Sequence, residues 1–192
     1  MIDPLYFFVF AGLFSPGPNV ILLSVSGAVF GFRRTVPHIL GVAIGVGLTA
    51  GLTGLGIAAL LAEVPLLEVM LKVVAAGWIL FMAFRLFMAN RPEERNARRP
   101  FRFHEAVLFQ WVNPKVWAVA LAAASGYASG QGPMEEGMRL AIAFAGINFF
   151  VCMFWTWAGQ LLSFLLTTPV AWKLFLRVMA AALAASAAMI FL

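Results

Sequence analysis

The chain has 192 residues, of which 63% are hydrophobic and 11% are charged, and its formal net charge is +5 at pH 7. Soluble domains carry about 25% charged residues. The composition therefore excludes a soluble domain and indicates an integral membrane protein in a lipid bilayer. A positive balance suggests nucleic acid in a soluble protein, but here its meaning depends on the side of the membrane that each charge occupies. We expect no nucleic-acid partner.

Six segments, each long and apolar enough to span a membrane, make a single transmembrane domain of residues 1–192. A spanning helix needs about 20 apolar residues. No basic residue precedes the first segment, in contrast to a cleaved signal peptide, so we interpret it as a retained span. The predicted fold is all-α, and its spans are Pro4–Phe30, Val36–Ala62, Pro65–Ala89, Glu105–Tyr127, Arg139–Leu166 and Pro169–Phe191.

The longest polar connection, residues 90–104, divides the chain into two halves of three spans each, residues 1–89 and 105–192. Ten of the 13 Lys and Arg residues fall on the same side of this scheme as the connection. Because cytoplasmic loops are rich in Lys and Arg, we expect loop 90–104 in the cytoplasm and both termini outside. An odd number of spans in each half makes the two halves inverted repeats.

Two helix-breaking motifs interrupt the apolar segments. SPGPN, Ser15 to Asn19, lies in the first span, and NPK, Asn113 to Lys115, lies in the fourth. At 1.5 Å per residue, both fall close to the bilayer midplane. Lipid offers no hydrogen-bond partner to the freed backbone groups. Matching breaks in oppositely oriented halves are typical of a transporter with its site between the repeats, so we predict broken first and fourth helices.

In the first motif, Ser15 is expected to cap the half-helix that begins at Pro16 or Pro18, because Ser suits the cap and Pro suits the first turn. The freed amides of Gly17, Asn19 and the following residue would then lie at a positive helix end. Such an end attracts an anion, for example a carboxylate.

In the second motif, Asn113 is the expected cap, Pro114 the first helical residue and Lys115 the next. A cation there is opposed by the helix dipole and costs a further ~2.5–3.5 kcal/mol at mid-bilayer. Two partners for Lys115 are open: a substrate carboxylate, or the carbonyls freed by the break in the first span. Gln110 and Asn148 either donate into a cavity or form interhelical hydrogen bonds.

The candidate substrate-binding residues are those of the two motifs and the glutamine just before the second. We expect no catalytic residue, no cofactor and no metal site. One cysteine, Cys152, and two histidines, His38 and His104, placed at the cytoplasmic interface, cannot form an intramembrane metal site. The candidates are Ser15, Pro16, Gly17, Pro18, Asn19, Gln110, Asn113, Pro114 and Lys115.

The glycines of the second span recur at a spacing that favours close helix packing. Gly41 and Gly45 are four residues apart, as are Gly47 and Gly51. Small residues at this spacing let membrane helices approach closely. We predict a packing face on this span.

The combination of SPGPN, the GFRRxxxHxxG pattern from Gly31 to Gly41 and NPK resembles the lysine exporter (LysE/RhtB-type) family of bacterial amino-acid export translocators. The resemblance is clear from the first to the fourth span and weaker in the last two. It implies a protein of the cytoplasmic membrane that exports amino acids or close derivatives, driven by the proton motive force. It also implies that both motifs carry function.

The leading hypothesis is therefore a secondary exporter of an amino acid, by alternating access around a midplane site. The alternative transport function is export of a metal cation or another ion. A membrane-embedded hydrolase with Ser15 as nucleophile and Lys115 as base is the alternative outside transport. Whether the protein forms a homo-oligomer is left open.

Overall fold

The computed structural model describes residues 3–56, 65–89, 99–130 and 132–188, and these residues form helices joined by short connections. The ends of the predicted second and sixth spans, and most of the predicted loop 90–104, lie outside the described residues. The helices are α1 Pro4–Phe14, α2 Pro18–Phe30, α3 Phe32–Gly54, α5 Pro65–Phe87, α6 Phe103–Trp111, α7 Pro114–Gly126, α8 Pro133–Ser163 and α9 Pro169–Ala188.

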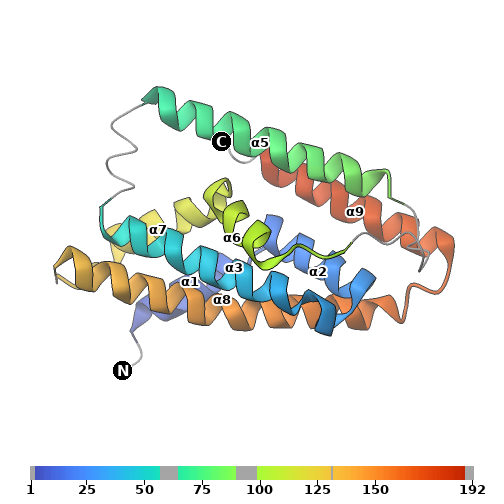
Figure 1. Cartoon of the computed structure of the whole chain (residues 1–192), viewed down its shortest axis with the longest axis horizontal. Helices are drawn as coiled ribbons and strands as arrows, with labels where there is room; N and C mark the ends of the chain where they lie inside the picture. The colour runs from blue at the N-terminus through green and yellow to red at the C-terminus, as the bar shows by residue number, and fades with distance from the viewer. Residues whose placement is uncertain (1–2, 57–64, 90–98, 131, 189–192) are drawn as a thin grey trace.

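Successive segments run back and forth along the long axis of the molecule (Figure 1). Helices α1 and α2 together run in one direction, and α3 returns in the other. The pair α6 and α7 follows the direction of α3, and α8 reverses it again (Figure 1). Both predicted breaks are confirmed, since α1 and α2 meet at a bend of 61° and α6 and α7 at a bend of 63°.

Among the described residues, α3, α8 and α9 are each long and apolar enough to cross a membrane, and the two bent pairs qualify as one span each. These give up to five spans, and the chain is a helical membrane protein. In α5, Ala76–Phe87 forms a shorter apolar helix. The count of six spans therefore stays a prediction.

Two helices begin several residues before the start of the predicted span. Helix α3 begins at Phe32, where the prediction has Val36, and α8 begins at Pro133, where the prediction has Arg139. The 31 residues of α8 have a length of about 46 Å, which exceeds the ~30 Å hydrocarbon core. Its first turns therefore extend past the apolar layer, which allows Glu136 to be part of the helix.

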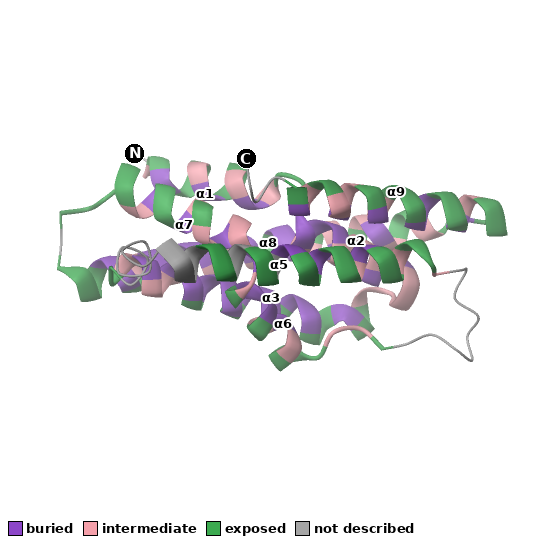
Figure 2. Ribbon diagram, turned by 90° about the horizontal axis from the view of Figure 1, so that it is seen from above, coloured by how far each residue is buried: buried purple, intermediate pink, exposed green. Residues whose placement is uncertain are grey.

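The centre of the bundle is the pair α3 and α8, which have the most extensive mutual contact. Helices α1 and α2 pack on α8, while α6 and α7 pack on α3. Helices α5 and α9 form a separate pair that contacts the rest through α2. Figure 2 shows buried positions concentrated in α2, α3 and α8, with the outer sides of α5 and α9 exposed.

Close approach of backbones holds α2 to α8. A Cβ at Gly27 would lie 2.0 Å from the backbone oxygen of Thr156, and one at Gly159 would lie 2.0 Å from that of Ser24. Neither gap accepts a methyl group. Small residues are what allow membrane helices to pack this closely.

The predicted packing face of α3 is confirmed and divides between two neighbours. A Cβ at Gly41 or Gly45 would collide with α6, and one at Gly47 would collide with α8, where Ala145 Cβ is 2.7 Å away. The close contacts therefore join the central helix to both of its partners.

Replacing Gly159 with alanine is expected to destabilise the protein strongly, because the new methyl group must push α8 away from α2. Thermal unfolding of the purified protein in detergent measures the effect. Gly146→Ala is the matched control in the same helix, since no atom lies within 4 Å of a Cβ there. An equal melting temperature for both variants would contradict this packing.

One end of the bundle is joined by an ion-pair network around Arg139. Its Nη2 donates to Asp3 Oδ2 at 2.6 Å and its Nη1 donates to Glu136 Oε1 at 2.9 Å. The same Nη1 donates to the backbone oxygen of Tyr127 at 2.8 Å. Asp3 also caps α1, because its Oδ1 accepts from the amide of Leu5 at 2.9 Å. The network connects the start of α1, the end of α7 and the start of α8.

The contribution of Asp3 to stability is expected to disappear in acid. The hydrogen bond from Arg139, followed by that from the Leu5 amide, lowers the pKa of Asp3 below its ordinary value of 3.8. Because the pKa of Asp3 is lower in the folded state than in the unfolded state, its stabilising contribution is complete above pH 3.8. This contribution is lost as the pH falls through the folded-state pKa. Asp3→Asn keeps the cap but not the charge, so wild type should unfold at a higher temperature than the variant near pH 7. In titrations of melting temperature, that difference should vanish in acid.

The predicted solvated position of His38 is wrong. Its side chain is 2% exposed and its ring centroid lies 5.1 Å from that of Phe101. Helix α3 starts before the predicted position, so His38 falls in its second turn and faces the segment that leads into α6. His104 is exposed, as predicted.

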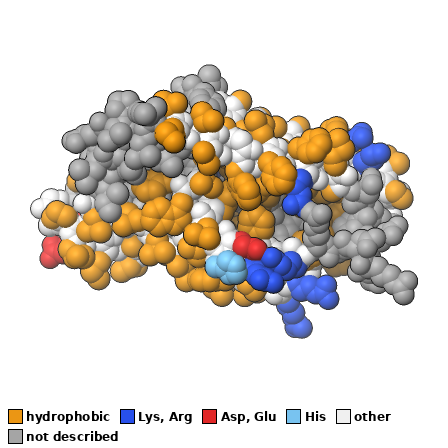
Figure 3. Space-filling model, turned by 45° about the horizontal axis from the view of Figure 1, so that its top comes forward, with side chains coloured by type: hydrophobic (Ala, Val, Ile, Leu, Met, Phe, Trp, Pro, Cys, Tyr) orange, Lys and Arg blue, Asp and Glu red, His pale blue; other side chains and the backbone are white. Residues whose placement is uncertain are grey.

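The surface is mainly apolar, as expected for contact with lipid. On the face shown in Figure 3, hydrophobic side chains cover most of the described surface, and Lys and Arg side chains gather toward one end. Arg99 pairs with Glu105 at 2.6 Å.

Candidate functional site

At the first break, the end of α1 is exposed at Ser15 and Pro16, while the start of α2 is buried at Gly17 and Pro18. Helix α1 ends with the amide of Ser15 donating to Ala11, and the Ser15 hydroxyl donates back to the oxygen of Gly12 at 2.8 Å. Helix α2 is preceded by Gly17 and starts at Pro18. The predicted cap by Ser15 is therefore wrong, because this side chain points back to α1. No side chain caps α2, so the amides of its first turn face the break.

The second break has Asn113 at the cap position and Pro114 as the first residue of α7, as predicted. The side chain of Asn113 does not cap the helix. Instead its Nδ2 lies 3.4 Å from Gln110 Oε1, one turn earlier in the chain. Gln110 is fully buried.

Two side chains join the breaks to each other. Each is the second residue of the half-helix that starts at one break, and each hydrogen-bonds to a residue at the other break. Lys115, second in α7, donates through Nζ to the backbone oxygens of Ser15 and, at 3.3 Å, of Pro16. Asn19, second in α2, donates through Nδ2 to Gln110 Oε1 at 2.8 Å. The ammonium group of Lys115 thus lies at the negative carbonyl end of α1, which compensates its unfavourable place at the start of α7.

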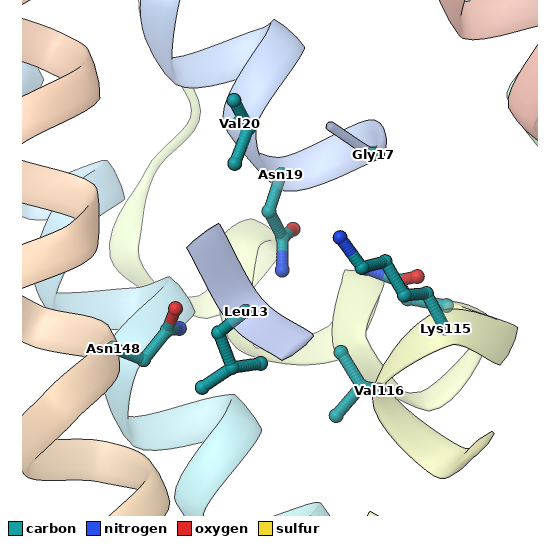
Figure 4. Close-up of a pocket in the computed structure, with 8 residues that line it drawn as sticks. Leu13, Gly17, Asn19, Val20, Lys115, Val116 and Asn148 are labelled. Atoms are coloured by element: carbon teal, nitrogen blue, oxygen red, sulfur yellow. The ribbon is translucent and has the colours of Figure 1, made fainter. Parts of the chain in front are cut away.

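A small pocket lies where the two breaks meet, with room for about one water molecule. Figure 4 shows the Lys115 amine turned toward Gly17 and the Asn148 side chain entering from α8. The pocket has one apolar side and several polar groups. It is lined by Leu13, Gly17, Asn19, Val20, Asn113, Lys115, Val116 and Asn148.

The structure brings together most of the predicted candidates. Gly17, Asn19, Asn113 and Lys115 line the pocket, and Gln110 lies behind them. The others shape the breaks: Ser15 and Pro16 accept from Lys115, while Pro18 and Pro114 start the two half-helices.

Asn148 also lines the pocket, although it was not among the selected candidates. It is 2% exposed, and its Nδ2 has no hydrogen-bond partner among the described residues. The sequence had indicated it as either a cavity donor or an interhelical hydrogen-bonding residue, because it is a polar side chain inside an otherwise apolar run.

The geometry does not support the hydrolase alternative. Lys115 contacts the backbone oxygen of Ser15, whereas the Ser15 hydroxyl contacts Gly12. A nucleophile and its base must be within hydrogen-bond reach of each other. In the described parts of the chain, no three His, Cys, Asp or Glu side chains are grouped so as to hold a metal ion.

A helical membrane bundle with a buried polar pocket between two helix breaks has the architecture of a membrane transporter. The chain matches the family model described as LysE type translocator over residues 10–192, and it belongs to this family. It is thus a transporter and not an enzyme. The match confirms the resemblance found in the motifs and extends it through the last two segments.

The chain is also similar to curated efflux proteins. It is 29% identical over 151 residues to the cysteine/O-acetylserine efflux proteins of Salmonella paratyphi A and Salmonella typhi, a stretch that covers 77% of this chain and 76% of each relative. The protein of the same name from Salmonella typhimurium has the same identity and coverage. No solved structure matches the chain.

Proposed function

We propose that this protein is a secondary transporter that exports an amino acid or a close derivative from the cytoplasm across the cell membrane, driven by the proton motive force. Transport proceeds by alternating access around the pocket between the two breaks. The observation that carries the proposal is the reciprocal bridging of the breaks, in which Lys115 reaches α1 and Asn19 reaches α6.

The packing supports two inverted halves, residues 1–89 and 105–192, as the moving units. The broken helix of the first half packs on α8 of the second, and the broken helix of the second half packs on α3 of the first. The bends of 61° and 63° are nearly equal. Exchange of the halves preserves these two contacts, as expected for inverted repeats that rock against each other. The contact of α9 with α2 is not matched by one of similar extent between α5 and α7 in the described residues.

In the proposed site, the uncapped first turn of α2 and the ammonium group of Lys115 bind the substrate carboxylate. In the described conformation Lys115 is held by Ser15 and Pro16 instead. An ammonium group has three N–H donors, so the two backbone oxygens leave room for a substrate carboxylate on the same nitrogen. A bound carboxylate would compete with these oxygens for Lys115 and so couple occupancy of the site to movement of the first break.

The pocket is too small for an amino acid in this conformation, which we interpret as closed around the site. We propose that the network of Arg139 with Asp3 closes its outer side. If this network lies on the outer side, both termini face outward and loop 90–104 lies in the cytoplasm. This orientation agrees with the charge distribution.

The relatives are named for efflux of cysteine and O-acetylserine. We propose small zwitterions of this kind as the first substrates to test. Leu13, Val20 and Val116 give the pocket an apolar wall that suits a short side chain.

The test is the level of each amino acid inside cells that carry or lack this chain, during a load of amino acids or dipeptides. An exporter should lower the pool of its substrate and raise the external concentration. Cysteine and O-acetylserine belong in the panel. If no pool changes although the protein is present in the membrane, the proposed function is wrong.

A further inference from the structure

Gln110 fixes the orientation of two neighbouring amide side chains. Its Nε2 donates to the backbone oxygen of Ala106 at 2.9 Å, which leaves Oε1 facing the breaks. This oxygen accepts from Nδ2 of Asn19 at 2.8 Å and lies 3.4 Å from Nδ2 of Asn113. Because both asparagines turn their NH2 groups to Gln110, both turn their oxygens away from it.

The two oxygens that are turned away are buried acceptors. Within the described residues, Asn19 Oδ1 and Asn113 Oδ1 have no hydrogen-bond donor, and both side chains line the pocket. Asn113 is only 1% exposed. A buried acceptor without a donor is unfavourable, so two at one small pocket indicate a ligand that brings donors.

The pocket also carries donors. Asn148 Nδ2, from α8, is buried and donates to no group in the described part of the chain. Lys115 Nζ, from α7, is the second donor, and Figure 4 shows Asn148 and Lys115 on either side of Asn19. The pocket thus combines acceptors without donors and groups that can donate, which is the pattern that a zwitterion complements.

We propose that Asn19 Oδ1 and Asn113 Oδ1 form a subsite for the primary ammonium group of the substrate, with Gln110 as the positioning residue and Asn148 as a carboxylate donor. This inference rests on the proposed function and specifies its substrate class. The substrate has a free, unsubstituted α-amino group.

Asn19 lies in the first turn of α2 and Asn113 at the cap position of α7, and both helix dipoles oppose a cation there. The two amide oxygens are therefore the groups that would have to hold a substrate ammonium group, as the carbonyls at the end of α1 hold that of Lys115.

The test uses the purified full chain in proteoliposomes, with L-cysteine, L-cysteine methyl ester and N-acetyl-L-cysteine as probes. Wild type should bind cysteine and its methyl ester, which keeps the ammonium group, and should reject N-acetylcysteine. For Asn113→Leu, the affinity for cysteine should fall by about tenfold, or ~1.4 kcal/mol, with no change for N-acetylcysteine. Asn113→Asp keeps an oxygen acceptor and should keep the discrimination.

Asn148→Leu is the matched control for the proposed carboxylate donor. It should weaken binding of cysteine but not of the methyl ester, which lacks the carboxylate. Gln110→Met should reduce the preference of the folded protein for cysteine over N-acetylcysteine, whereas a purely structural role would lower the melting temperature without changing that preference.

Three results would overturn the subsite: equal affinity of wild type for cysteine and N-acetylcysteine, binding of none of the three probes, or an unchanged preference in a folded Asn113→Leu. A wild type that exports an amino acid but fails these criteria leaves the proposed function intact. A wild type that exports none of the panel contradicts both.

Discussion

Replacement of Lys115 with alanine is expected to abolish export while the protein still reaches the membrane. The variant loses the two contacts to Ser15 and Pro16 that hold the first break, as well as the proposed counter-charge for the substrate. Hydrogen bonds to charged groups contribute about 1.5–3 kcal/mol each, so loss of two predicts a fall of at least about 100-fold. Initial rates of export, normalised to protein in the membrane, measure the effect.

Two further variants separate charge from packing. Lys115→Met keeps the length and apolar stem of the side chain without the charge, and should be as inactive as alanine. Lys115→Arg keeps the charge with a different donor geometry, and partial export is expected. Wild-type export by the methionine variant would refute a role for the ammonium group.

A disulfide between Gly12→Cys and Val119→Cys is expected to stop transport completely and reversibly. A Cβ at Gly12 would lie 3.7 Å from that of Val119, which is within the range for a disulfide. The two positions are on α1 and α7, in opposite halves and beside the pocket. The bond would hold these half-helices together and keep the site closed on that side. The assay is export before and after oxidation, in a chain with Cys152→Ala, followed by reduction.

The control for this experiment is a disulfide within one half. Ser26 and Thr35 belong to α2 and α3, and their hydroxyl oxygens are 2.9 Å apart. A bond between cysteines at these positions should leave transport largely intact, because halves that move as rigid bodies tolerate internal links. Inhibition by this bond, or full export with Gly12 and Val119 joined, would contradict rocking of the halves.

The breaks could be predicted from the sequence because they are determined locally. Proline removes a backbone donor and collides with the preceding turn, so SPGPN and NPK interrupt a helix in any surroundings. The close packing of Gly41 and Gly47 followed from the same kind of local argument, since residue size alone permits it.

Features that depend on distant parts of the chain were not predictable from the sequence. The prediction that Ser15 caps α2 was wrong, because its hydroxyl donates to the backbone oxygen of Gly12 in the preceding turn. His38 is buried because Phe101, 63 positions later in the sequence, covers it. The ion pair from Arg139 of α8 to Asp3, before α1, joins positions 136 residues apart in the sequence.

For Lys115, the sequence supported two partners, and the described conformation contains one of them. The carbonyl end of α1 holds the ammonium group. The substrate carboxylate remains the proposed second partner, because an ammonium group that donates to two backbone oxygens has a third N–H donor. The bridge from Asn19 to Gln110 was not predicted, although both motifs place a polar residue directly after a helix-starting proline.

The pocket between the breaks is proposed to carry an amino acid across the membrane. The most direct test is uptake of labelled amino acids, cysteine and O-acetylserine included, into proteoliposomes that contain the purified chain, with and without an imposed proton gradient. We expect accumulation of at least one substrate, dependent on the gradient and absent with Lys115→Ala. Accumulation by Lys115→Ala at the wild-type rate, or none by wild type, would contradict it.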